Sequence, residues 1–324
     1  MRRMTNASDT SLPNGDTSTV RRLFEKAWII INPAVRQGHG ADAIRQVAIE
    51  QQRAGADWRV RVSMRPGQAE ALAAEAVDAG AKLVLAVGGH GTAHEVVNGL
   101  MRFDAERRTV FSVVPVGSGN DLAKILGVPE GIQPALAALR AGRLASIDLG
   151  RVGPRWFVND IGLGLLADAN RLYHSMPRLL LGPVRYMAAA LGSALRNRAC
   201  HLRLSSDAEA RFDGPFSICS VSNGAWTGGR FYMNPRAVVD DGLLEVCVAE
   251  PVGRWEALTT LPKLRRGLHL GSPHVTSFQT ASLRLESDDL EIYQVDGELN
   301  EFPRDGLEIR IARRALRVLC LSKT

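Results

Sequence analysis

The sequence predicts an α/β plus β protein, with an N-terminal Rossmann-like parallel α/β domain followed by a C-terminal antiparallel β-sandwich domain. Its 324 residues suit two domains of ordinary size. In the first half, short apolar runs alternate with segments whose apolar residues recur at helical spacing, which is typical of a parallel sheet covered by helices. After about residue 147, strand-like runs follow one another closely, which favours antiparallel strands.

The first domain is expected over residues 26–147. Residues 1–25 are rich in Ser, Thr, Asn, Asp and Gly without apolar periodicity, so they are expected to form a disordered leader. Four strand–helix units then imply right-handed crossovers and a parallel sheet. The strands are predicted at 27–31, 58–63, 83–87 and 109–116, and the helices at 42–53, 69–77, 96–101, 122–126 and 134–141.

The second domain is expected over residues 148–312, and a strand within 313–324 is expected to return to the first domain. Hairpin turns are indicated at Asp288-Asp289 and at Asp296-Gly297. Strands are predicted at 156–159, 202–204, 216–222, 243–249, 283–286, 291–295, 298–302 and 307–311, and helices at 166–174, 184–196 and 254–266.

Charge and cysteine content limit the expected binding partners and cellular location. A net charge of +6 suits an anionic partner, but the Lys and Arg residues are dispersed rather than gathered in a stripe, so nucleic acid is not expected. Four separated cysteines without a CxxC pair fit a reduced cytoplasm. The sequence has neither an uninterrupted apolar run long enough for a membrane span nor a secretory signal, so any membrane contact is expected to be peripheral.

The central stretch is GGHGT at 88–92, which lies between an apolar strand and a helical segment. Three glycines let the backbone turn sharply and approach a ligand, and the N–H groups at the helix start favour an anion such as phosphate. A tight connection without a ligand is the alternative, and the loop alone does not decide between them. Polar turns at Asn32-Pro33, Ser63 and 117–121 are expected on the same sheet edge. Neither glycine loop has P-loop or GxGxxG spacing, so bound phosphate would need a metal or Arg.

Carboxylates in the second half are the candidate metal and base residues. Asp240-Asp241-Gly242 precedes a strand, and Asp296-Gly297-Glu298 lies at a predicted hairpin, although an Asp-Gly pair most often marks only a turn. Because Mg²⁺ usually takes one or two protein carboxylates, Asp241 would suffice. His90, His94 and His274 lack metal-ligand spacing and are expected to be polar surface or turn residues.

Seven motifs occur in one order between residues 26 and 321. They are INP at 31–33, Ser63 with Gly67-Gln68-Ala69, GGHGTAHEVVNGL at 88–100, PVGSGNDLAKILG at 115–127, FVNDIGLG at 157–164, NPRAVVDDGLLEV at 234–246 and VDGE at 295–298. Together they resemble the diacylglycerol kinase catalytic-domain superfamily, which includes bacterial lipid kinases and the sphingosine and ceramide kinases. The resemblance implies a nucleotide-binding first domain and a lipid-binding second domain.

The resemblance also implies an ATP-dependent kinase that phosphorylates a hydroxyl of a diacylglycerol-like or long-chain-base lipid, in lipid metabolism and phospholipid biosynthesis. Glu298 would be the general base, with Asp296 beside it. The implied ATP-binding residues are Asn32, Pro33, Ser63, Gly88, Gly89, His90, Gly91, Thr92, Glu95, Gly117, Ser118, Asn120 and Asp121. The implied Mg²⁺ residues are Asp241, the backbone of Val238 and Leu243, and Asp148 through water.

One residue departs from the family pattern, because His90 stands where the family has Asp in GGDGT. An imidazole cannot act as an anionic oxygen ligand, although its cationic form could contact phosphate. Two alternatives are therefore kept: an NAD kinase-like enzyme, and a nucleotide-binding protein with weakened catalysis. The expected partners are ATP and a lipid substrate at the membrane surface, and a homodimer is left open.

Overall fold

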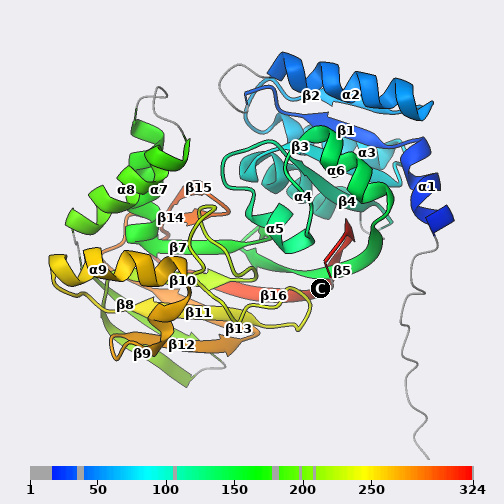
Figure 1. The fold of residues 1–324 in the computed structure, drawn as a ribbon. Coiled ribbons are helices and arrows are strands. Elements are labelled where there is room, and N and C mark those ends of the chain that lie inside the picture. The colour runs from blue at the N-terminus through cyan, green and yellow to red at the C-terminus, as the bar shows by residue number, and fades with distance from the viewer. Residues whose placement is uncertain are drawn as a thin grey trace, which may run out of the picture.

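The first lobe of this computed structural model is a parallel sheet between two layers of helices (Figure 1). The structure describes residues 17–34, 40–104, 108–176, 182–196, 199–206 and 209–322. The parallel strands lie in the order β2-β1-β3-β4. They are β1 (Trp28–Ile31), β2 (Arg59–Val62), β3 (Leu83–Gly88) and β4 (Val110–Pro115).

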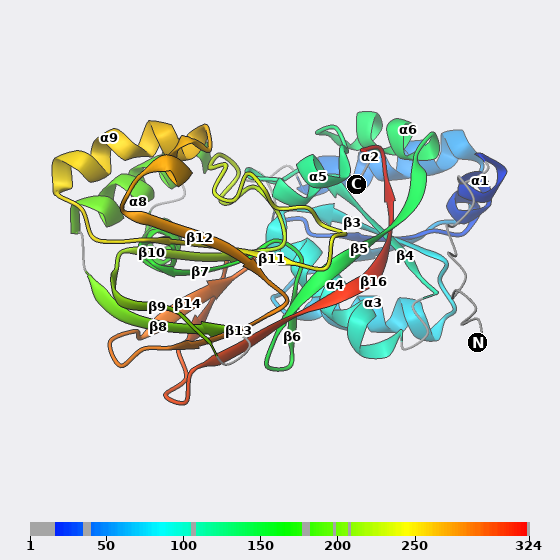
Figure 2. The same cartoon turned by 90° about the horizontal axis from the view of Figure 1, so that it is seen from below.

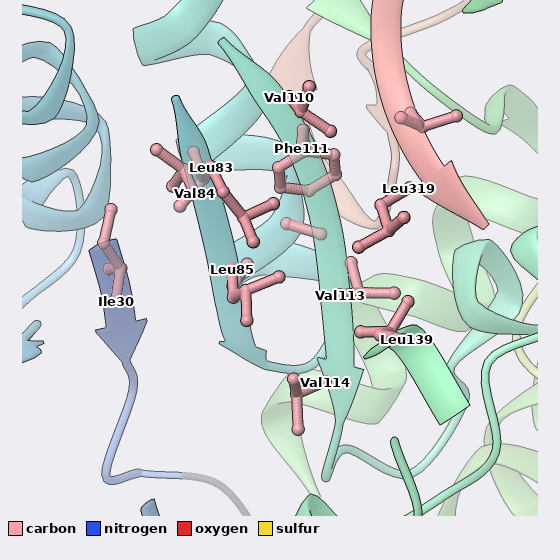
Figure 3. Packing of buried hydrophobic residues seen from close by; sticks show 14 of the residues in the cluster. Ile30, Leu83, Val84, Leu85, Val110, Phe111, Val113, Val114, Leu139 and Leu319 are labelled. Atoms are coloured by element: carbon pink, nitrogen blue, oxygen red, sulfur yellow. The ribbon is translucent and has the colours of Figure 1, made fainter. Parts of the chain in front are cut away.

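Helices cover both faces of this sheet. In Figure 2, α1 (Thr17–Glu25), α2 (Gly40–Ala54), α5 (Asp121–Leu126) and α6 (Ile132–Arg140) lie above it, and α3 (Gln68–Asp78) and α4 (His90–Phe103) lie below it. Every residue of β1, β3 and β4 is buried, because a parallel strand with helices on both sides has no solvent face. Figure 3 shows Leu85, Phe111 and Val114 among the side chains of this core.

The second lobe consists of antiparallel strands in two layers. One layer contains β5 (Arg143–Val152), β6 (Arg155–Phe157), β8 (Cys200–Ser206), β9 (Glu209–Phe216), β13 (Ser282–Glu286) and β16 (Leu307–Cys320). The other has the order β12 (Val275–Thr280), β11 (Leu244–Ala249), β10 (Ile218–Ser222), β7 (Asp160–Gly164), β14 (Ile292–Val295) and β15 (Glu298–Glu301). A buried cluster unites residues of both layers, with Phe216 and Leu285 from the first and Leu163 and Val246 from the second. The predicted α/β plus antiparallel β architecture is confirmed.

Three helices gather at the far side of the second lobe: α7 (Leu165–Ser175), α8 (Gly182–Arg196) and α9 (Arg254–Arg265), followed by the 3-10 turn η1 (Leu268–Gly271) (Figure 1). They pack on one another and, through α7, on β7, β10 and β14. Within the described part of the chain, no helix combines the length and apolar character needed to cross a bilayer.

Strand β16 joins the two lobes. Its first residues pair with β13, whereas residues from Leu316 onward pair with the beginning of β5, and Val318 lies opposite Phe111 of β4. The register shifts between Ala312 and Leu316, next to Arg314 with its positive φ of 48°. The ten-stranded sheet therefore runs from β2 in the first lobe to β9 in the second without a break.

Two sequence predictions are wrong in part. Residues 17–25 form helix α1 rather than a disordered leader, because Val20 and Phe24, one turn apart, are buried on the first lobe. Trp58 Nε1 donates to the Phe24 carbonyl oxygen at 2.6 Å. Residues 1–16 lie outside the described residues. Asp288-Asp289 is not a hairpin, since β13 and β14 belong to different sheets and this turn connects them.

The structure predicts that the end of β16 is part of the first core. Leu319 is fully buried, so Leu319→Ala should lower the free energy of unfolding by about 2–5 kcal/mol through lost burial and a cavity. Leu299→Ala is the matched control, because Leu299 is 37% exposed, and it should cost less than about 1 kcal/mol. Urea unfolding measures both. Equal losses in the two variants would contradict the placement of β16.

Candidate functional site

A cleft of about 270 Å³ is lined by residues of both lobes, including those that follow the carboxyl ends of β3 and β4. Such an edge is where open parallel sheets bind ligands. The first lobe contributes His90, Gly91, Ser118 and Asp121 to its lining, all of them predicted site residues. The second contributes the predicted Asp296 and Glu298, together with Asn159, Asp160, Asn170, Tyr173, His174, Thr227, Arg230 and Gln294, which the sequence analysis did not single out as site residues.

The two glycine loops lie face to face at the back of this cleft. A Cβ atom on Gly117 would come within 2.7 Å of the Gly89 Cα atom, so a side chain there would force the backbones apart. A Cβ atom on Gly88 would lie 2.4 Å from Thr92 Oγ1, and that hydroxyl accepts a hydrogen bond from Asn32 Nδ2 at 3.1 Å. These glycines are therefore required by close packing, and they bring the N-terminus of α4 to the cleft.

His90 lies against the second loop and pairs with Asp121. Its Nε2 atom is 2.8 Å from the Asp121 backbone nitrogen and 3.1 Å from Asp121 Oδ2. The neutral ring can accept from that N–H, and the protonated ring can donate to the carboxylate. Burial disfavours the imidazolium, but the charge and hydrogen bond of Asp121, together with the charges of Asp296 and Asp160, outweigh it, so the pKa of His90 is raised. The ring sits so close to Gly119 that a Cβ atom there would lie 2.3 Å from His90 Cε1.

Asp121 is 1% exposed and is held on three sides. Beyond His90, its oxygens accept from Lys124 Nζ at 3.1 Å and from the Gly229 N–H at 2.9 Å. Burial alone would raise the pKa of Asp121, but the charge and hydrogen bond of His90, with Lys124, hold it below its usual range. Asp121 is therefore an ionised link between the α5 start and the loop at Gly229.

Asp296 is buried in the turn between β14 and β15 and holds the two lobes together. With φ of 48° at Asp296 and 90° at Gly297, this turn matches the predicted two-residue hairpin. The carboxylate accepts the N–H groups of Val158, Asn159 and Asp160 at 2.9–3.1 Å. These hydrogen bonds assign Asp296 a positioning role in the turn that carries Glu298.

Helix α4 reaches the same carboxylate through His94, whose Nδ1 atom is 3.1 Å from Asp296 Oδ2. Burial opposes ionisation of Asp296, but the hydrogen bond and charge of His94 together with the backbone N–H groups lower its pKa. His94 is 3% exposed, so its prediction as a surface or turn residue is wrong, whereas His274 is exposed as predicted. The contact spans 202 residues of sequence, which spacing alone could not indicate.

Asp160 is the main residue that sequence analysis did not select. It is 3% exposed, and burial, followed by the charges of Asp296 and Asp121, raises its pKa to about 7. Gln294 Nε2 donates to Oδ2 at 3.0 Å, and Thr227 Oγ1 lies 3.1 Å from the same atom. The only sequence signal was the Asn159-Asp160 pair inside the apolar run FVNDIGLG.

Glu298 faces the glycine loop across the cleft. It is exposed, and its Oε1 atom lies 2.9 Å from where a Cβ atom of Gly91 would be. Asn170 of α7 donates to the Gly297 carbonyl oxygen at 2.5 Å, and Gly297 N–H donates to Gln294 Oε1, also at 2.5 Å. The tip of the hairpin is therefore anchored, and a carboxylate projects beside the start of α4.

Other predicted nucleotide residues do not line the cleft. Both Glu95 oxygens accept N–H groups at the start of α3, from Gly67 and Ala69 at 2.9 Å, so Glu95 is a helix cap and does not line the cleft. Ser63 is buried and follows β2, and Pro33 continues the turn after β1. Asn120 has a positive φ of 57° and donates to the Gly117 carbonyl oxygen, which fixes the second loop.

The predicted metal residues meet in a different place and do not line the cleft. The two Asp148 oxygens accept the N–H groups of Gly242 and Arg314 at 2.6 and 2.5 Å, and Asp241 Oδ1 accepts the Leu243 N–H. Arg313 donates to the Asp241 carbonyl oxygen at 3.3 Å, which places a cation beside this loop. Val238 is 45% exposed on the same loop. These contacts do not fit a preformed Mg²⁺ site.

No group of three or more His, Cys, Asp or Glu side chains among the described residues is arranged to hold a metal ion. The cleft instead offers hydrogen-bond donors from the glycine loops, the exposed cation of Arg230 and the carboxylate of Glu298. This combination suits a phosphorylated ligand next to an acceptor that must lose a proton.

Two family models together match most of the chain. Residues 26–152 match the diacylglycerol kinase catalytic domain, and residues 159–320 match the YegS C-terminal NAD kinase beta sandwich-like domain. A protein of Cronobacter sakazakii (strain ATCC BAA-894) named "Probable lipid kinase YegS-like" is 30% identical over 259 residues, which cover 78% of this chain and 82% of that protein. The diacylglycerol kinase of Bacillus subtilis (strain 168) is 26% identical over 276 residues, covering 85% and 90%.

Solved structures share the fold. The crystal structure of a diacylglycerol kinase from Bacillus anthracis str. Sterne superposes with a TM-score of 0.74 at 21% identity, covering 92% of this chain and 97% of that one. An NAD kinase from Archaeoglobus fulgidus in complex with ATP superposes with a TM-score of 0.51 at 12% identity, covering 91% and 93%. The two-lobed architecture is therefore common to this chain and to both kinds of kinase.

The raised pKa of Asp160 predicts a pH-dependent stability. The folded protein keeps a proton at Asp160 up to a pH of about 7, whereas the unfolded chain releases it near 3.8, so folding stability falls as pH rises through this window. Asp160→Asn resembles the protonated form and should remove the decline, on the order of 2 kcal/mol by pH 8. His90, whose pKa is also raised, acts in the same direction above pH 6.5, and the variant keeps its main cause, the charge and hydrogen bond of Asp121.

Thermal melting from pH 5 to pH 8 measures this effect. Asp288→Asn is the matched control, because the Asp288 side chain is 87% exposed and lies far from the cleft in the turn after β13. The Asp160→Asn protein should gain stability over the parent mainly at the alkaline end, and the control should follow the parent. A constant difference across the range would contradict the assigned pKa.

Proposed function

The chain belongs to the diacylglycerol kinase catalytic-domain family of lipid kinases, and on that premise we propose that it transfers the γ-phosphate of ATP to a hydroxyl of a lipid. The acceptor class is a diacylglycerol-like or long-chain-base lipid. The observation that carries the proposal is the position of Glu298 opposite Gly91, because a carboxylate beside a phosphate-binding loop is what hydroxyl phosphorylation requires.

Three kinds of group in the cleft take part in this reaction: backbone N–H groups, a guanidinium and a carboxylate. The N–H groups at the start of α4 and the guanidinium of Arg230 neutralise phosphate charge. The oxygen of the lipid hydroxyl bonds to the γ-phosphorus while Glu298 accepts the hydroxyl proton. The bond from the γ-phosphorus to the bridging oxygen of ADP breaks. Asp296 does not take part in proton transfer, since its carboxylate is held by backbone N–H groups and His94.

Mg²⁺ enters this proposal as the ion that accompanies ATP. Protein-bound Mg²⁺ in phosphoryl-transfer sites keeps several waters and is held largely by phosphate oxygens, where it offsets negative charge. The contacts around Asp241 and Asp148 favour a structural role for that loop. No step of the reaction is assigned to the loop.

The two alternatives have less support. An NAD kinase-like activity is not favoured, because the catalytic-domain model and the named relatives point to lipid kinases. Weakened catalysis was suggested by His90 in place of Asp. In the cleft His90 Nε2 lies 3.1 Å from Asp121 Oδ2, and Glu298 lies opposite Gly91, so the groups assigned to phosphoryl transfer are present without an aspartate at position 90.

A membrane surface is the proposed source of the lipid. Helix α8 exposes Val184 and Leu191, at 55% and 40%, around a shallow hollow that also includes Arg230 and Arg265. Apolar side chains flanked by cations suit a bilayer with anionic headgroups. Because Arg230 also lines the cleft, this surface adjoins the proposed site of phosphoryl transfer.

Substitution of the proposed base tests the mechanism. Glu298→Gln should lower the rate of lipid phosphorylation by at least about 100-fold, because the amide cannot accept the hydroxyl proton. Glu301→Gln, on the same strand and exposed outside the cleft, is the matched control and should retain the parental rate. Radiolabel transferred from ATP to lipid is the measurement. Full activity of Glu298→Gln would refute the assignment.

Charge reversal tests the membrane surface. Arg265→Glu should weaken binding to vesicles containing anionic phospholipid by about tenfold, through lost attraction and new repulsion. Arg45→Glu on α2 in the first lobe is the control and should bind as the parent does. Cosedimentation with vesicles measures both, and an identical loss in both variants would contradict a localised surface.

A further inference from the structure

A second cavity lies in the second lobe, between the helices α7, α8 and α9 and the strands β10, β11 and β12. Its volume is about 100 Å³. Most of its lining is aliphatic or aromatic, as in Leu165, Ile218, Phe231 and Val275. Leu166 lines both this cavity and the cleft, so the two are neighbours. If the head of a lipid lies in the cleft, its apolar chain can therefore enter the neighbouring cavity.

Two polar atoms in this apolar lining are buried without a hydrogen bond. Ser217 and His269 are 5% and 2% exposed, and within the described residues neither Ser217 Oγ nor His269 Nδ1 has a partner. Leaving a buried polar atom unpaired costs about 1–3 kcal/mol. Both residues line the same cavity, so a hydroxyl group in it is one partner that would complete their hydrogen bonding.

The hydrogen-bonding character of His269 is fixed by its other nitrogen. Nε2 lies 2.9 Å from the carbonyl oxygen of Met233, which can only accept, so Nε2 carries the proton. Burial, opposed by that hydrogen bond, lowers the pKa of His269 from its usual 6.5. The ring is therefore neutral near pH 7, and Nδ1 is an acceptor that needs a donor.

We infer that this cavity binds an aliphatic chain that carries a hydroxyl group, which donates to His269 Nδ1 and can also pair with Ser217 Oγ. The inference rests on the proposed function and names its acceptor more closely, as a lipid with a hydroxylated chain. A plain chain fills the volume but leaves both atoms unpaired. The rim residues Glu250 and His274 are 3.6 Å apart and paired with each other, so the inner contact is the selective one.

The inference is tested by binding to the full chain without ATP. The probes are stearic acid and a panel of octadecanoic acids with one hydroxyl at successive chain positions, each displacing a fluorescent fatty acid. The parent should bind at least one hydroxylated isomer about tenfold more tightly than stearic acid. His269→Phe should abolish that preference while still binding stearic acid. His274→Phe, at the rim, is the control and should keep the preference.

Ser217→Ala guards against loss of folding, since it removes one small polar atom, and it should reduce the preference severalfold. The inference is overturned if the parent binds all isomers and stearic acid equally, which is the result expected if a bound water pairs with the two atoms. It is also overturned if both His269→Phe and Ser217→Ala keep the preference unchanged. If the protein phosphorylates lipid but shows no preference for hydroxylated chains, the proposed function holds and the cavity assignment fails. A hydroxyl preference without phosphorylation would reject the kinase but keep the cavity assignment.

Discussion

The geometry of the site depends on the hydrogen bonds made by the buried carboxylate of Asp296. It receives three consecutive backbone N–H groups from the β6–β7 link and the imidazole of His94 from α4, so a single hairpin turn of the second lobe is attached to the phosphate-loop helix of the first. Removing one partner of such a buried network leaves the others unsatisfied, which makes the arrangement strongly all-or-none. The position of Glu298, two residues later, follows from it.

The glycine loops impose the complementary constraint. Gly89 and Gly117 approach so closely that a side chain on Gly117 would not fit, and the His90 ring packs against Gly119. The buried carboxylate of Asp121 is paired with the ammonium of Lys124 and lies 3.1 Å from His90 Nε2, whose pKa its charge helps to raise. Among the described residues no cation forms a salt bridge with Asp160, and burial, followed by the charges of Asp296 and Asp121, raises its pKa. Of these two carboxylates in the cleft, Asp121 is paired with a cation, whereas Asp160 is hydrogen-bonded by the neutral groups of Thr227 and Gln294.

The sequence was sufficient wherever local pattern decides structure. Fully apolar runs predicted the parallel strands, and Asp296-Gly297 predicted the hairpin, because turn chemistry needs only neighbouring residues. Helix α1 was missed because only Val20 and Phe24 mark its buried face. Contacts such as His94 with Asp296 join residues far apart in the chain, and the burial that shifts Asp160 arises only when both lobes assemble. The hydrogen bond from His269 to Met233, which defines the cavity acceptor, is likewise invisible in sequence.

As a lipid kinase, the protein must transfer phosphate from ATP to a lipid oxygen in this cleft. The most direct measurement is incubation of the full chain with Mg²⁺, ATP labelled in its γ-phosphate and a total-lipid extract dispersed in detergent micelles, with NAD offered in a parallel reaction. The account predicts label in a chloroform-soluble phospholipid and none in a dinucleotide. Label confined to NADP or to inorganic phosphate would contradict it.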